Sequence, residues 1–171
     1  MANTNLLKSL VEKEMISTFC QKHQIELLHL STKQIHSIFN DMEPDLIGYQ
    51  PCQKALYIGE ITTSGFLGQR GRDFHVGAVK KVFEAFSKFY LFHDDAENII
   101  KRTNRHFLEV NIESIKCFFI VPEGSKFINA LGYRKRLFDK GYMTLETIEL
   151  TKDTQDIMIK ILMDSRNENK L

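Results

Sequence analysis

The chain has 171 residues, of which 43 % are hydrophobic and 26 % are charged, with a net charge of +1. This length fits one domain with its own core, and the composition excludes a disordered chain. The total charge does not indicate a strongly basic nucleic-acid binder, although the segment 64–140 carries 14 Lys and Arg against 9 Asp and Glu. That basic segment either faces phosphates or reflects ordinary variation in composition.

The three cysteines, Cys20, Cys52 and Cys117, lie far apart and lack the paired spacing of a zinc site or a disulfide framework. No apolar run reaches the roughly 18 residues that a membrane span needs, and the N-terminus has no signal-peptide core. We therefore expect a cytoplasmic protein that makes no membrane contact.

Hydrophobic periodicity predicts the elements in chain order. The first part of the chain is expected to form a helix over 6–23, a strand over 25–30, a helical turn or irregular connection over 32–40, and strands over 44–50 and 55–62 joined by a turn. After a glycine-rich loop at 64–71, we expect helices over 73–90 and 95–104, a strand over 115–121, a helix over 126–140, a strand over 145–150 and a helix over 153–164. This order predicts one α/β domain over 1–171, with a mixed sheet flanked by helices.

Two carboxylates fall at notable places in the predicted hairpin. Asp45 opens one strand after Pro44, and Glu60 lies inside the next strand, in an otherwise apolar run. A buried ionised Glu is costly unless it pairs or binds a cation. Because the two strands are expected to be adjacent, both carboxylates could meet and bind Mg²⁺ or Mn²⁺. Such a metal can activate water for phosphodiester hydrolysis.

Pro44-Asp45 followed by Glu60-Ile61-Thr62 resembles the motif of the PD-(D/E)XK nucleases, which include many restriction endonucleases. The resemblance covers about 6–121 and implies an αβββαβ core, with 126–164 as an extension. It also implies that Asp45 and Glu60 hold the metal, together with the main-chain carbonyl of Ile61.

The family's lysine is replaced here by Thr62, which carries no charge. Some family variants move the lysine onto the following helix; viral cap-snatching endonucleases, which cut RNA, show a similar order. Lys80 and Lys81 are the candidates. The predicted apolar stripe of this helix is formed by Val79, Val82, Phe83, Phe86 and Tyr90. Lys81 points away from that stripe whereas Lys80 lies on its flank, so we expect Lys80 to be catalytic and Lys81 to contact nucleic acid.

Glu14 lies near the centre of the first helix's predicted apolar stripe of Leu7, Leu10 and Val11, whereas Glu12 points outward. In many family members a carboxylate of this helix joins the metal site, so Glu14 resembles that residue. The alternatives are a buried salt bridge or a helix face that is partly open to solvent.

Several polar side chains are candidates for contacts with the substrate. Arg70 and Arg72 in the glycine-rich loop could bind phosphates, and Gln69 resembles a glutamine that some family members place after the motif. A plain surface connection is the alternative for this loop. The basic run 134–136 either contacts phosphates or forms a solvated helix face.

The motif and the element order indicate a DNA endonuclease that depends on Mg²⁺ or Mn²⁺. Restriction or another defence role is one option for it, and repair or recombination is another. A homodimer would suit the cutting of two strands. Three alternatives stay open: an RNA endonuclease with the same site, a degenerate nuclease fold that only binds, and a chance occurrence of the motif in an unrelated α/β enzyme.

Overall fold

A computed structural model describes residues 5–68 and 75–168. This part of the chain forms a five-stranded sheet in the order β1-β2-β3-β4-β5. The strands β1, β2 and β3 run antiparallel, whereas β3, β4 and β5 run parallel. The strands are β1 (Glu26–Leu27), β2 (Leu46–Gln50), β3 (Ala55–Ile61), β4 (Ser114–Pro122) and β5 (Thr144–Ile148). The predicted mixed sheet with flanking helices is confirmed.

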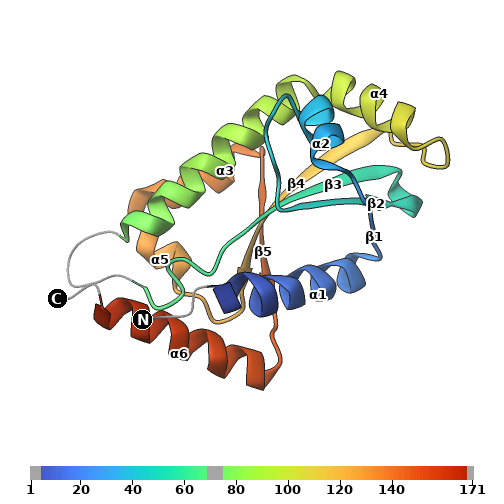
Figure 1. Ribbon diagram of the computed structural model, residues 1–171. Coiled ribbons are helices and arrows are strands. Elements are labelled where there is room, and N and C mark those ends of the chain that lie inside the picture. Colours follow the sequence, from blue (N-terminus) through green and yellow to red (C-terminus); the bar gives the residue numbers. More distant parts are fainter. Residues whose placement is uncertain (1–4, 69–74, 169–171) are drawn as a thin grey trace.

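Helices cover both faces of the sheet (Figure 1). They are η1 (Leu7–Glu12, a π-helix), α1 (Lys13–His23), α2 (Thr32–Phe39), α3 (Val76–Asp94), α4 (Ala96–His106), α5 (Phe127–Leu131) and α6 (Lys152–Glu168), with 3₁₀ segments η2 (Pro51–Gln53) and η3 (Gly132–Lys140). One face carries α2, α3, α4 and α5, and the other carries α1 and α6. Within the described residues, no helix is both long and apolar enough to cross a membrane.

Two helical segments differ from the sequence-based expectation. The segment 32–40 is a regular helix, because Ser31 and Gln34 form a capping box in which the Ser31 hydroxyl accepts from the Gln34 N–H at 3.3 Å. The segment 126–140 is not one helix. Gly132 adopts a φ of +61°, which ends α5 and leads into the 3₁₀ segment η3.

The sheet separates two hydrophobic clusters, and the alternation of side chains along β3 determines which of the two faces Glu60 lies on. Leu56 and Ile58 pack with α3, whereas Tyr57 and Ile61 pack with α1. Because successive side chains of a strand point to opposite faces, Glu60 belongs to the face that carries α3. The candidate carboxylate of β3 therefore meets side chains of that helix.

The buried face of α3 is rotated from the predicted stripe. Its buried residues are Ala78, Val82, Ala85, Phe89 and Phe92, whereas Phe83 and Tyr90 are 45 % and 47 % exposed. The prediction gave the large side chains the inner face and was wrong for Phe83 and Tyr90. The two alanines, which are fully buried, let the helix backbone approach the sheet closely. This rotation decides which lysines of α3 face the sheet.

Candidate active site

Asp45 connects the start of β2 to the end of β3. Its main-chain N–H donates to the carbonyl of Gly59 at 3.0 Å, and its carboxylate Oδ2 accepts from the N–H of Ile61 at 2.9 Å. Pro44 precedes it and has no N–H to extend the ladder. The Asp45 carboxylate thus accepts a hydrogen bond from the main chain of β3 at the residue after Glu60. The two motif carboxylates therefore belong to neighbouring segments of the sheet.

Glu60 is buried, with 6 % of its surface exposed. Its Oε1 accepts a hydrogen bond from the Nζ of Lys88 at 2.7 Å. Burial and, next, the negative charge of Asp45 raise the pKa of Glu60 to about 7, against the opposing charges of Lys88 and Lys81. Burial and the neighbouring Asp45 thus both disfavour the charged form of Glu60, and a bound cation would favour it.

Lys88, on α3, is the lysine that contacts the motif. Its ammonium also donates to the main-chain carbonyl of Glu43 at 2.9 Å, so it joins α3 to the segment before β2. Lys80, expected to be catalytic, is exposed on α3. The Nζ of Lys81 lies 4.0 Å from the Oε2 of Glu84. The positive charge of Lys81 also lowers the pKa of Glu60. Lys88 was missed because the predicted stripe placed it on the outer face.

A signal for Lys88 was nevertheless present in the sequence. Lys81 and Lys88 are seven residues apart, so they share one face of a helix. Once Val82 and Phe89 are taken as the centre of the buried face, both lysines fall on its flank. Lys80 lies about 100° farther around the helix, toward solvent.

In the first helical segment, the carboxylate that interacts with the charge of Asp45 is Glu12, and the expectation that Glu14 joins the site needs correction. Glu14 accepts hydrogen bonds from the N–H and hydroxyl of Thr151 and from the hydroxyl of Thr154, at the start of α6. Burial disfavours its charge, but these bonds from Thr154 and Thr151 lower the pKa of Glu14. Its carboxylate is therefore occupied in joining α1 to α6.

Glu12 is partly buried, and its pKa is raised by burial and then by the charge of Asp45. The residues buried at the start of the chain are Val11, Met15 and Phe19, whereas Leu10 is 36 % exposed. With the buried stripe centred on Met15, Glu12 lies nearer to its centre than Glu14 does. The outward orientation predicted for Glu12 is wrong for this reason.

Thr62 stands where the family has lysine, and here it forms the exit from β3. It is 4 % exposed, its N–H donates to the carbonyl of Ile120 at 3.0 Å, and its hydroxyl accepts from the N–H of Ser64 at 3.0 Å. These contacts give Thr62 a role in shaping the turn. The remaining predicted contacts, Gln69, Arg70 and Arg72, lie outside the described residues.

The side chains that could hold a divalent metal are the carboxylates of Asp45 and Glu60. Within 5–68 and 75–168, no three His, Cys, Asp or Glu side chains gather closely enough to hold an ion. Mg²⁺, however, is commonly held by one or two carboxylates, with water and substrate phosphate filling its other positions. Asp45 and Glu60 supply hard carboxylate oxygens on neighbouring segments, and the negative charge of Asp45 helps to raise the pKa of Glu60, so the pair fits Mg²⁺ or Mn²⁺.

Neither models of known protein families nor curated protein sequences give a match to this chain.

Proposed function

We propose that this protein is a divalent-metal-dependent endonuclease that hydrolyses phosphodiester bonds in DNA. The observation that carries the proposal is the contact of Lys88 with Glu60, next to the carboxylate of Asp45. Two acids on neighbouring strands and a lysine from the following helix are the groups that this chemistry needs. The order α1, β1, α2, β2, β3, α3, α4, β4 contains the αβββαβ elements of the PD-(D/E)XK nucleases in sequence, with α2 added between the first two strands and α4 after α3, and this order supports such a core.

The chain's own residues would share the work as follows. Asp45 and Glu60, with the main-chain carbonyl of Ile61, would hold Mg²⁺ or Mn²⁺. When bound, the metal would supply positive charge that polarises the phosphate and lowers the pKa of the attacking water. Lys88 would orient that water and offset negative charge on the phosphate, in place of a lysine at position 62. Glu12 would act as a positioning residue through its coupling to Asp45.

The test is cleavage by the purified full chain of supercoiled plasmid, linear duplex DNA and single-stranded RNA, with Mg²⁺ or Mn²⁺. The double variant Asp45→Ala/Glu60→Ala removes both acids, and Glu97→Ala is a matched control because Glu97 is an exposed acid on α4. Metal-dependent cutting that only the double variant loses supports the proposal. No cutting of any substrate, with no Mn²⁺ binding by calorimetry, favours a degenerate fold that only binds or a chance occurrence of the motif in an unrelated α/β enzyme.

RNA is the second candidate substrate, and one observation favours it. The lysine that reaches Glu60 comes from α3, after Glu60-Ile61-Thr62, which is the order that the cap-snatching RNA endonucleases also show. Cleavage of matched DNA and RNA strands of one sequence separates the two substrates. For duplex DNA a homodimer would place one site on each strand, which sedimentation of the protein on its DNA would test.

A further inference from the structure

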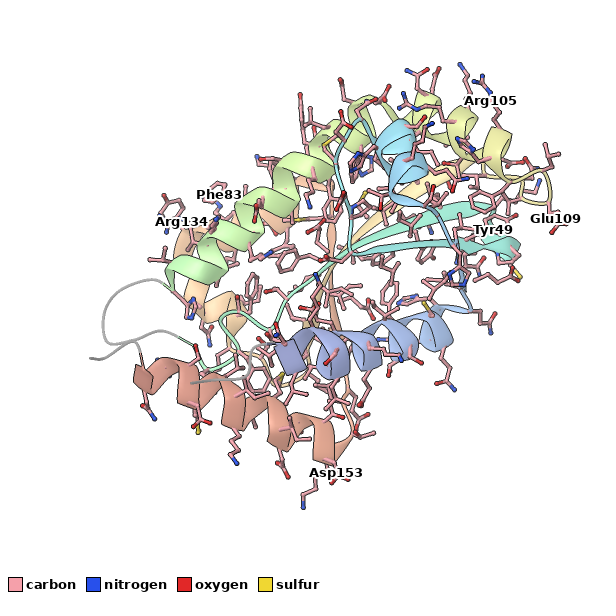
Figure 2. All side chains as sticks on the ribbon, in the orientation of Figure 1. Tyr49, Phe83, Arg105, Glu109, Arg134 and Asp153 are labelled. Carbon is pink, nitrogen blue, oxygen red and sulfur yellow. The ribbon has the colours of Figure 1, made fainter. Side chains whose placement is uncertain are left out.

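A hollow between α3 and η3 lies apart from the carboxylates. It has a volume of about 510 Å³, within the range of ligand sites. Its lining is formed by Phe83, Tyr133, Arg134, Arg136, Leu137, Asp139 and Lys140. Figure 2 shows Phe83 and Arg134 next to each other at this edge of the molecule. No residue of the hollow belongs to the candidate active site.

Two aromatic rings of the hollow are open to solvent. Tyr133 is 69 % exposed and Phe83 is 45 % exposed. The guanidinium of Arg134 stacks on the Tyr133 ring, with its Cζ 4.6 Å from the ring centroid. Exposed aromatic rings beside arginine are the stacking platforms on which proteins hold unpaired bases.

The charge of the hollow suits a polyanion. Three cations, Arg134, Arg136 and Lys140, line it with one acid, Asp139. A chain of phosphates spaced between bases would satisfy both the cations and the rings. An acidic peptide would satisfy the cations but would give the rings no flat partner.

The hollow and the candidate active site both involve α3. Lys81 and Lys88 flank the sheet side of α3, and Phe83 is two residues beyond Lys81, about 200° around the helix. The hollow and the two lysines thus lie on different sides of the same helix. A strand that leaves the site and crosses the solvent face of α3 would meet the hollow.

We propose that this hollow binds an unpaired segment of nucleic acid next to the bond that is cut, with bases stacked on Tyr133 and Phe83 and phosphates on Arg136 and Lys140. The inference rests on the proposed function in assigning the bound strand to that reaction. It narrows the substrate to nucleic acid with a single-stranded flank, such as an overhang, a flap or a single strand.

The test measures fluorescence anisotropy of a labelled oligothymidylate of about 15 nucleotides, long enough for a typical single-strand site. The full chain is kept in EDTA so that binding is read without cleavage. Tyr133→Ala is expected to weaken binding about 5- to 150-fold, because stacking on one ring contributes that much, whereas Tyr133→Phe should bind like the wild type. Arg136→Ala should lower the slope of log affinity against log salt by about 0.7.

The matched control is Arg105→Ala, since Arg105 is an exposed arginine at the far end of the molecule (Figure 2). Equal binding by wild type and Tyr133→Ala would overturn the inference, as would equally tight, Tyr133-dependent binding of a polyglutamate peptide. The two proposals fail separately. Binding that depends on Tyr133, without cleavage of any substrate, would contradict only the proposed nuclease activity. Cleavage of flapped DNA that Tyr133→Ala does not affect would contradict only the proposed role of the hollow.

Discussion

The Nζ of Lys88 lies 2.7 Å from the Oε1 of Glu60, so that α3 supplies a cation to the strand that carries the motif acid. The same ammonium contacts the carbonyl of Glu43, two residues before Asp45. One lysine thereby contacts both β3 and the segment that leads into β2. Its loss should affect the chemistry more than the fold, because the ammonium lies at the edge of the core, with 26 % of the side chain exposed.

Replacing Lys88 tests its assignment against that of Lys80. Lys88→Ala should lower the cleavage rate about 100-fold or more, the usual effect of removing one group that stabilises developing charge. Lys80→Ala should change it by less than about twofold, since the Lys80 side chain is exposed. The rates are measured on the preferred substrate under single-turnover conditions. The opposite ranking would return the catalytic role to Lys80.

The raised pKa of Glu60 predicts how stability depends on pH without metal. In the folded protein the carboxyl group of Glu60 holds its proton up to about pH 7, whereas in the unfolded chain it releases the proton near pH 4.5. The folded state therefore binds more protons between these values, and the free energy of unfolding falls as pH rises through them. This difference in pKa corresponds to about 3 kcal/mol.

Glu60→Gln removes that titration, so the stability of the variant relative to wild type should rise by up to about 3 kcal/mol between about pH 5 and pH 8. Urea unfolding in EDTA at the two pH values measures it. Parallel pH profiles for the two proteins would show that Glu60 is ionised throughout this range.

A divalent metal should stabilise the wild type by neutralising Asp45 and Glu60. At about 100 times its dissociation constant, a ligand that binds only the folded state adds about 2.7 kcal/mol. Thermal unfolding with and without Mn²⁺ should show a higher Tm with metal for wild type and for Glu97→Ala. The double variant Asp45→Ala/Glu60→Ala should show no rise, and an equal rise in all three would place the metal elsewhere.

Substitutions of Glu12 and Glu14 should have different effects, one on the rate of cleavage and the other on the free energy of unfolding. Glu14→Ala leaves Thr151 and Thr154 without their acceptor and should cost about 1 kcal/mol, as loss of a helix cap does, with cleavage unchanged. Glu12→Gln should keep or increase stability, since burial and Asp45 disfavour its charge, but should slow cleavage. Paired urea titrations and rate measurements check this. Slow cleavage by Glu14→Ala with normal cleavage by Glu12→Gln would reverse the two roles.

The sequence by itself determined the sheet and the acids of the motif. Strand alternation and the short connection between β2 and β3 are local features, so Asp45 and Glu60 could be expected on adjacent strands from the printed letters. The apolar run around Glu60 likewise indicated that its carboxylate would be buried, and that the charge would need a partner.

Only the tertiary structure decided which helix residues complete the site. The face that α3 turns to the sheet is set by the burial of Ala78 and Ala85, and the face of η1 and α1 by the burial of Val11, Met15 and Phe19. Periodicity located both helices but not the rotation of each about its axis. Rotating a helix by less than half a turn about its axis brings Lys88 to the site in place of Lys80, or Glu12 in place of Glu14. The rotation itself is set by packing between segments that are far apart in the chain, so the sequence pattern of one helix does not determine it.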